Sequence, residues 1–215
     1  MRTTLLCLHG FTMNAAGLRY MLADLEPRLA DVVDFVYPSA PHTASEESVA
    51  GLAAALGGFR QKPPNLQWWN ASEDGLTYLG WNESREFLAR EVARYPRVAV
   101  FGFSQGAAVA AALAAASARG EFPRLDFVVL CAGFAARARD IAATFSSPVP
   151  VPSLHVWGAA DTFAKHAPAL LERFDPATRE ELRWEGRHLV PTSGPPADAL
   201  VDFIRRHASP TTPPA

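Results

Sequence analysis

The most informative stretch of this chain is Val98-Ala99-Val100-Phe101-Gly102-Phe103-Ser104-Gln105-Gly106-Ala107. An apolar, β-branched run leads into a Gly-x-Ser-x-Gly pattern, and an alanine-rich stretch continues to Ala118. This order predicts a strand, a sharp turn with Ser104 at its apex, and a helix. Glycines suit the crowded positions two residues before and after the serine. The first amides of the helix then point towards whatever the serine attacks, so the stretch predicts a nucleophile elbow.

Length, composition and charge narrow the class of protein. A chain of 215 residues, 49% hydrophobic and 20% charged, is expected to form one domain with a substantial core. Its net charge of −2 predicts no binding to nucleic acid or to acidic membranes. We predict no membrane span and, because the first apolar stretch is too short for a signal peptide, a cytoplasmic location. Cys7 and Cys131 lie in apolar runs and are expected to be buried thiols rather than a disulfide or a metal site.

Strand-like and helix-like segments alternate along the chain. The apolar runs are continuous, which is typical of parallel strands that are covered on both faces. The repeated strand-then-helix units predict an α/β fold, a doubly wound sheet of about six mainly parallel strands with helices on both faces. Strands are expected at Thr4–Leu8, Val32–Tyr37, Arg97–Phe101, Asp126–Leu130, Ser153–Trp157 and Glu181–Trp184. Helices are expected from near Asn14, at 46–56 with Ser45 as cap, at 83–94 with Asn82 as cap, after Ser104, near 163–174 and near 197–207.

Two segments break this rhythm. Residues 57–80 are rich in Gly, Pro, Asn and Trp and show no clear period, so they are a candidate lid or substrate loop. Residues 208–215 are rich in Ser, Thr and Pro and are predicted to be a disordered tail. The expected organisation is therefore one domain over residues 1–207, followed by that tail.

Ser104 needs a base to take its proton, and the base needs an orienting acid. On sheets of this kind the order along the chain is serine, acid, histidine, each just past the carboxyl end of a strand. Asp161 follows the strand that ends at Trp157, and Gly158 allows the tight turn between them. His188 lies in a loop past the last strand, whereas His166 and His207 fall on predicted helices. We therefore predict Ser104, Asp161 and His188 as the catalytic residues.

The developing negative oxygen needs two backbone donors. The amide of Gln105, directly after the nucleophile, is one candidate. The second is the amide of Phe11, because Gly10 lets the loop after the first strand approach closely. His9 is interpreted as a positioning residue, and this chemistry requires no metal or cofactor.

Four further residues are candidate substrate contacts. His42 follows the second strand, and Phe103 precedes the nucleophile. Trp68 and Trp69 belong to an aromatic cluster in the irregular segment, which is either a satellite apolar cluster or an acyl pocket over the site.

Taken together, these motifs resemble the FSH-type family of serine hydrolases in the α/β-hydrolase superfamily. The resemblance rests on Leu6-Cys7-Leu8-His9-Gly10-Phe11 with Asn14, Tyr37…Ala40-Pro41-His42, Trp68-Trp69, Gly102-Phe103-Ser104-Gln105-Gly106-Ala107-Ala108, Pro152-Ser153-Leu154-His155-Val156 with Asp161, and His188-Leu189-Val190-Pro191. It implies a single-domain α/β-hydrolase fold with strands in the order 2-1-3-4-5-6. It also implies hydrolysis of carboxylic esters, and of thioesters as a further class, by Ser104, Asp161 and His188. The family usually has Gly-Gly before this histidine, whereas this chain has Gly186-Arg187, a difference that bears on substrate preference.

The function that these observations favour is a carboxylesterase that cleaves small acyl esters through an acyl-enzyme intermediate. An acyl-thioesterase, or a hydrolase that releases the product of a biosynthetic pathway, is the alternative among enzymes. From other classes, the alternatives are a non-catalytic binding protein of α/β-hydrolase fold and a protein that associates through an exposed Trp68-Trp69 loop.

Overall fold

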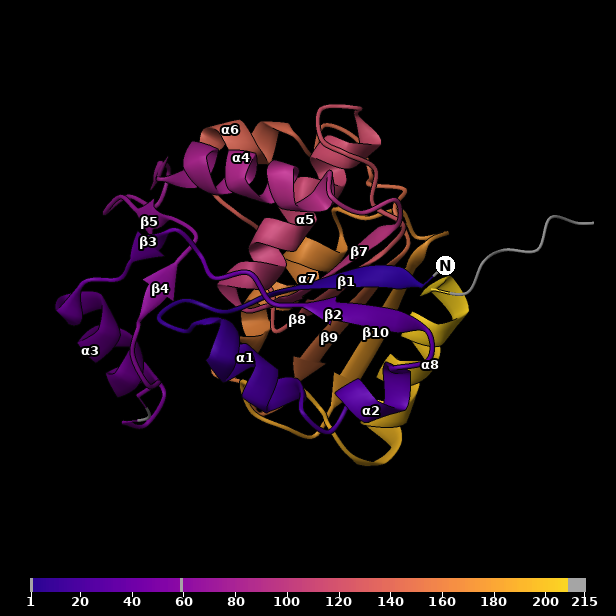
Figure 1. The fold of residues 1–215 in the computed structure, drawn as a ribbon. Helices are drawn as coiled ribbons and strands as arrows, with labels where there is room; N and C mark the ends of the chain where they lie inside the picture. The colour runs from indigo at the N-terminus through magenta and orange to yellow at the C-terminus, as the bar shows by residue number, and fades with distance from the viewer. Residues whose placement is uncertain (1, 59, 209–215) are drawn as a thin grey trace, which may run out of the picture.

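The centre of the molecule is a six-stranded sheet in which all neighbouring strands are parallel. The computed structural model describes residues 2–58 and 60–208. Strands lie in the order β10-β9-β8-β7-β1-β2 (Figure 1). Their bounds are Thr3–Leu8 (β1), Val33–Val36 (β2), Val98–Phe103 (β7), Val128–Cys131 (β8), Ser153–Gly158 (β9) and Arg179–Trp184 (β10). The predicted parallel sheet and its order 2-1-3-4-5-6 are confirmed, with β7 to β10 as the third to sixth strands.

The four central strands, β1, β7, β8 and β9, are buried along their whole length. Alternate residues of each strand point to opposite faces of a sheet. Leu6 and Val100 accordingly join one apolar cluster, and Leu5 and Phe101 join the other. Both faces therefore require apolar residues, which explains why the strands are continuous apolar runs.

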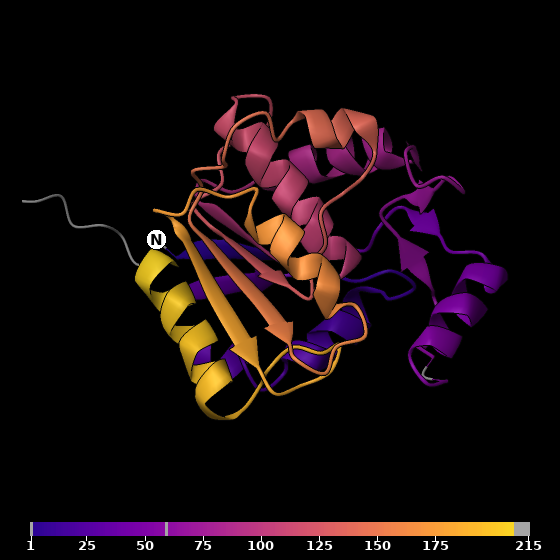
Figure 2. The same cartoon turned by 180° about the vertical axis from the view of Figure 1, so that it is seen from behind.

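Helices cover both faces of the sheet (Figures 1 and 2). The bounds are Ala15–Leu22 (α1), Glu26–Leu29 (α2), Glu46–Ala55 (α3), Trp81–Val92 (α4), Gln105–Ala118 (α5), Arg139–Ala143 (α6), Ala164–His166 (a 3-10 turn, η1), Ala167–Leu171 (α7) and Gly194–Ala208 (α8). Helices α1, α2 and α8 pack on one face, and α4, α5, α6 and α7 lie on the other. Helix α5 is buried from Gln105 to Ala116, because its small alanines let it lie close against the sheet.

Two of the predicted helix starts are confirmed, and one is wrong. The side chain of Asn14 accepts a hydrogen bond from the amide of Gly17 at the start of α1, and Ser45 caps α3 through the amide of Ser48. Helix α4 begins at Trp81, two residues before the predicted start, and Asn82 is not its cap. Gly80 takes that position with a φ of 85°, a left-handed conformation that glycine adopts without strain.

The predicted helix near 163–174 is broken in the structure. It consists of the 3-10 turn η1 followed by α7, which ends at Leu171. Pro168 lies in the first turn of α7, where its missing amide hydrogen costs nothing. A proline is tolerated at the beginning of a helix but not in its interior, so the helical segment restarts here.

The segment 57–80 has little regular structure, as its composition predicts. It holds the short strands Leu66–Gln67 (β4), Asn70–Ala71 (β5) and Tyr78–Leu79 (β6). Strand β4 pairs with His42–Thr43 (β3), and β5 pairs with β6, both antiparallel. At the other end of the chain, α8 continues to Ala208, and the rest of the predicted tail, 209–215, lies outside the described residues.

Candidate active site

Ser104 occupies the turn between β7 and α5 in a strained backbone conformation. Its φ is 54° and its ψ is −115°, in a region that residues with a side chain rarely adopt. Such strain costs about 1–3 kcal/mol and persists only where the surrounding structure enforces it. Here β7 is buried on one side of the turn and α5 on the other, so the chain has no room to relax.

The two glycines that flank Ser104 are required by close backbone contacts. A Cβ atom at Gly102 would lie 2.3 Å from the carbonyl oxygen of Gly106. A Cβ atom at Gly106 would lie 2.1 Å from the carbonyl oxygen of Leu8 in β1. Neither contact can be relieved by rotating a side chain, because both partners are backbone. The Gly-x-Ser-x-Gly pattern is therefore a packing requirement of this turn.

Ser104, His188 and Asp161 form a continuous line of hydrogen bonds. His188 Nδ1 lies 2.8 Å from Asp161 Oδ2, and His188 Nε2 lies 3.0 Å from Ser104 Oγ. The carboxylate only accepts, so Nδ1 carries the hydrogen, and Nε2 of the neutral imidazole then accepts from the serine hydroxyl. The structure thus brings together the three residues predicted from chain order, in the arrangement that activates a serine.

The loops that carry Asp161 and His188 touch each other directly. Asp161 follows β9, and His188 follows β10, the neighbouring strand. A Cβ atom at Gly158 would lie 2.1 Å from the carbonyl oxygen of Gly186, and the amide of Ala160 donates to that same oxygen at 2.9 Å. The second carboxylate oxygen of Asp161 accepts from the amide of Phe163 at 2.7 Å. These contacts fix the position of the acid relative to the base.

Aromatic rings enclose the imidazole of His188. The rings of Phe103 and Phe163 each lie 5.1 Å from it, centroid to centroid. The side chain of His188 is 9% exposed, and that of Asp161 is 1% exposed. This packing shields the Asp161–His188 pair from water and limits rotation of the ring, while Nε2 faces Ser104.

The predicted oxyanion donors lie where the β1 loop meets the start of α5. Within the described residues, the amides of Phe11 and Gln105 donate to no protein acceptor, so both are available to a ligand. Thr12, next to Phe11, has a φ of 60° and is held by Asn65, whose side-chain amide donates to its carbonyl at 2.7 Å. A fixed backbone of this kind is what a preorganised pair of donors requires.

The buried side chain of His9 stabilises this loop through two hydrogen bonds. Its Nδ1 donates to the carbonyl of Gly10 at 2.8 Å, and its Nε2 accepts from the amide of Ala40 at 3.0 Å. Burial lowers the pKa of His9 to about 4, so the ring is neutral at physiological pH. The ring is fully buried, which agrees with a positioning residue rather than a base.

The side chain of Gln105 has a role that sequence reasoning missed. Its Oε1 accepts from the amide of Trp68 at 2.9 Å, and its Nε2 donates to the carbonyl of Trp69 at 3.0 Å. The indole of Trp68 donates to the carbonyl of His9 at 2.8 Å. The Trp68-Trp69 segment is therefore tied to both the elbow and the β1 loop. The one signal in the sequence is a long polar side chain at the start of an otherwise apolar helix.

The structure does not bring three of the four candidate substrate contacts to the cavity. Trp68 and Trp69 are 0% and 3% exposed, so the exposed tryptophan loop considered above is a wrong prediction. They form an apolar cluster under the segment, in which Trp69 stacks on Tyr78. His42 donates from Nε2 to the carbonyl of Gly80 at 2.9 Å. Phe103 does line the cavity, next to His188.

A cavity of about 710 Å³ opens over Ser104 and His188. Helix α3 and the residues after it form much of its wall. The part of this wall after residue 56 belongs to the segment 57–80, the predicted lid or substrate loop, whereas α3 itself is not among the residues predicted for the site. These wall residues are Val49, Leu52, Ala55, Leu56, Gly57, Arg60 and Gln61. The remaining lining comes from the β1 loop and α1 (Gly10 to Met13, and Met21) and from the loops after β9 and β10 (Ala160, Thr162, Arg187 and Leu189).

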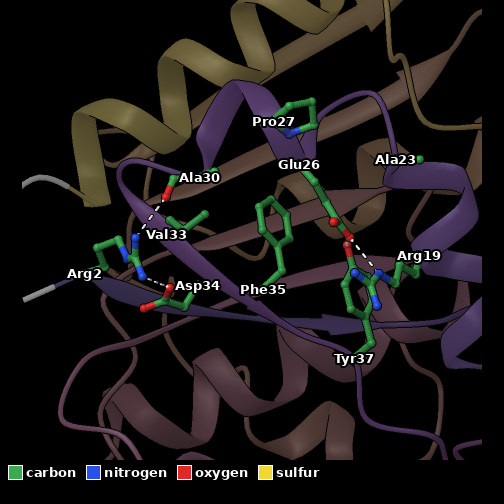
Figure 3. Close-up of a pocket in the computed structure, with 10 residues that line it drawn as sticks. All are labelled: Arg2, Arg19, Ala23, Glu26, Pro27, Ala30, Val33, Asp34, Phe35 and Tyr37. Carbon is green, nitrogen blue, oxygen red and sulfur yellow. Dashed lines mark hydrogen bonds and ion pairs between the residues drawn. The ribbon is translucent and has the colours of Figure 1, made fainter.

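A second hollow of about 600 Å³ lies at the free edge of β2, away from Ser104 (Figure 3). Its polar groups already pair with one another. Tyr37 donates its hydroxyl hydrogen to Glu26 at 2.8 Å, Arg19 donates to the same carboxylate, and Arg2 pairs with Asp34 (Figure 3). Because these groups satisfy one another, they offer no polar atom that clearly awaits a ligand, and the cavity over Ser104 is the better candidate for chemistry.

Within residues 2–58 and 60–208, no group of three His, Cys, Asp or Glu residues is placed to hold a metal ion. No helix in this part of the chain is long and apolar enough to cross a membrane.

The sheet, its helical layers and the serine at the β7–α5 turn define an α/β-hydrolase fold. The chain belongs to the serine hydrolase (FSH1) family, whose model matches residues 1–200. It is similar to Esterase OVCA2 of Bos taurus, 30% identical over 222 residues that cover 95% of this chain and 96% of that one. Esterase OVCA2 of Danio rerio is 30% identical over 224 residues, 94% of this chain and 96% of that one. The crystal structure of esterase PE8 has a TM-score of 0.68 at 18% identity, covers 96% of this chain and 93% of its own, and shows the likeness of fold. The chain is therefore a hydrolytic enzyme.

Proposed function

We propose that this serine hydrolase is a carboxylesterase of small acyl esters and that Ser104, His188 and Asp161 are its catalytic residues. The observation that carries the proposal is the unbroken line of hydrogen bonds from Ser104 to Asp161, at 3.0 and 2.8 Å, at the floor of a 710 Å³ cavity. The relatives named as esterases support small-molecule esters as the substrate class.

In the acylation step, His188 Nε2 takes the hydroxyl proton as Ser104 Oγ bonds to the carbonyl carbon of the ester. Asp161 keeps Nδ1 protonated and stabilises the imidazolium that forms. The amides of Phe11 and Gln105 donate to the negative oxygen of the tetrahedral intermediate. The bond to the leaving oxygen then breaks, and that oxygen receives the proton from Nε2.

In the deacylation step, a water molecule takes the place of the alcohol. His188 removes a proton from it, and the resulting nucleophile attacks the acyl carbon. The bond between Ser104 Oγ and the acyl group breaks, and Oγ recovers its proton from His188. The products are a carboxylic acid and a free enzyme, and no cofactor is needed.

The test is the loss of covalent labelling and turnover in Ser104→Ala. We expect the wild type to react with a fluorophosphonate probe and to hydrolyse 4-nitrophenyl esters, and the variant to do neither. Retained turnover in Ser104→Ala would refute the assignment.

Asp161→Asn should keep the fold but lower kcat about 10⁴-fold, because the imidazole loses its orienting acceptor. Acyl-CoA substrates run in parallel measure any thioesterase activity of the same site.

We also propose that the enzyme acts in the cytoplasm. The support is that Cys7 and Cys131 are free and buried, so the protein needs no oxidising compartment. Burial raises the pKa of both thiols, which keeps them protonated and unreactive. Fractionation of cells that express the tagged chain tests the location, and recovery in a membrane or extracellular fraction would contradict it.

A further inference from the structure

The cavity over Ser104 combines an apolar wall with positive charge. Helix α3 supplies Val49, Leu52 and Leu56 to the wall. Among the described residues that line it, the permanently charged ones are Arg60 and Arg187, and none carries a carboxylate. The carboxylate of Asp161 lies behind His188 and is 1% exposed, so it is bound to the imidazole rather than presented to the cavity.

The two arginines differ from most arginines of this chain in having no partner. Arg28, Arg97, Arg119 and Arg206, for example, pair with carboxylates. Within the described residues, the side chains of Arg60 and Arg187 make no ion pair and no hydrogen bond. Two unpaired guanidinium groups therefore line one cavity from two separate segments.

This arrangement matches an anionic group on the substrate. A guanidinium binds carboxylate and phosphate oxygens with two parallel hydrogen bonds. Arg187 directly precedes His188 in the chain, and both residues line the cavity next to Ser104. Arg60 follows α3, whose apolar residues are suited to an acyl chain.

We propose that the cavity selects acyl esters that carry an anionic group, a carboxylate or a phosphate, with the acyl chain against α3 and the anion at Arg60 and Arg187. This substrate class rests on the proposed esterase function. Neutral alkyl esters of the same size are poorer substrates, because they leave both guanidinium groups without a partner.

The test compares esters that differ only in charge. Mono-4-nitrophenyl succinate against 4-nitrophenyl valerate places the charge on the acyl side. On the leaving-group side, 4-acetoxybenzoate is compared with its neutral methyl ester. In a further arm, 4-acetoxyphenyl phosphate is compared with the same neutral ester. The readout is the ratio of kcat/KM for the anionic ester to that for the neutral ester. We expect a ratio above one in at least one arm, and that arm identifies the side and the kind of anion.

Arg60→Gln and Arg187→Gln should each lower this ratio about two- to fivefold, the range that exposed ion pairs support. Raising the salt concentration should also lower the wild-type ratio, because the arginines are solvent-accessible and salt screens such charges. Arg124→Gln is the matched control. The side chain of Arg124 is 91% exposed. Arg124 lies before the amino end of β8, whereas Ser104 follows the carboxyl end of β7. The kcat/KM ratio of the Arg124→Gln variant should therefore equal that of the wild type.

The possible failures are distinguishable. If the wild type hydrolyses neither member of any pair, or if Ser104→Ala hydrolyses them equally well, the proposed function is wrong. If the wild type hydrolyses the neutral esters through Ser104 but shows a ratio at or below one in every arm, only the anion selection is wrong. A ratio above one that neither arginine variant changes also overturns the assignment of Arg60 and Arg187.

Discussion

The nucleophile elbow and helix α3 face the same cavity but tolerate sequence change to very different degrees. From Val98 to Ala116, Ser104 is the one residue that is not buried. In α3, Val49 and Ala53 are the buried residues, and the helix stands off from the sheet at the side of the molecule (Figure 1). The nucleophile therefore lies in a segment in which almost every residue is constrained by packing, whereas part of the substrate wall lies in a helix with few buried residues.

One pair of substitutions should separate the two regions most strongly. In Gly106→Ala, the new methyl group overlaps the carbonyl of Leu8, so we expect a loss of about 3 kcal/mol in unfolding free energy, together with the loss of activity. In Gly51→Ala on α3, no atom lies within 4 Å of the added carbon, so we expect a gain of up to about 1 kcal/mol. Urea unfolding measures both, and equal changes would contradict the comparison.

The free energy of unfolding should fall in acid because of His9, which is buried next to the nucleophile elbow. Burial lowers the folded-state pKa of His9 to about 4, below its ordinary value of 6.5. Between these values the unfolded chain binds the proton more readily, so the stability that His9 contributes falls as pH decreases from 6.5 to 4. Relative to a His9→Gln variant, the wild type should lose about 3 kcal/mol more of its unfolding free energy by pH 4.

Urea unfolding at a series of pH values between 8 and 4 checks this expectation. His155 is also buried, and burial lowers its pKa to about 3, so the variant should still lose some stability in acid. Parallel curves for the wild type and His9→Gln would show that His9 does not contribute.

Gln105→Met should release the tryptophan segment from the elbow. The amide of Trp68 and the carbonyl of Trp69 would lose their partners in a buried site, which we expect to cost about 2 kcal/mol. Gln61→Met is the control on the α3 side, because Gln61 lines the cavity and makes no hydrogen bond within the described residues. Its stability should stay within about 0.5 kcal/mol of the wild type. An equal effect of the two variants in urea unfolding would contradict this role of Gln105.

The smallest effect on stability is expected at α3. Leu52→Ala removes part of a half-buried wall and should cost less than about 1 kcal/mol. It should nevertheless raise KM about threefold for long acyl chains, because each buried methylene of the chain contributes about 0.8 kcal/mol. A series of 4-nitrophenyl esters with increasing chain length measures the change. Ala54→Ser, on the exposed face of the same helix, should leave the series unchanged, and a change there would count against a wall formed by α3.

The structure of the elbow and the positions of the catalytic candidates could be predicted from the sequence, for a physical reason. In the elbow, packing restricts the residue type at almost every position. Positions 102 and 106, for example, have space only for glycine. Such restrictions are visible in the sequence as a pattern of residue types. The positions of Asp161 and His188 follow from a rule about strand ends, and the structure places both within hydrogen-bond distance of their partners. The order of the six strands is confirmed on the same basis.

The wall and the tryptophans could not be assigned in this way. An aromatic pair such as Trp68-Trp69 has the same sequence whether it faces a substrate or packs under a loop. Its burial is decided by Gln105 and His9, which lie far away in the chain. Helix α3 has a serine cap and many apolar residues, as a helix that packs on the core also would. Its sequence therefore does not distinguish a helix that borders a cavity from one that packs on the core.

The contact between Gly158 and Gly186 has a consequence for recombining related chains. The loops after β9 and β10 approach so closely that neither can be replaced without the other. A chimaera with its crossover between these strands would join an acid loop and a base loop that were never fitted to each other. Residues 153–191 are thus the smallest block that transfers the acid–base pair intact, whereas residues 46–56 can be exchanged alone to graft a new wall.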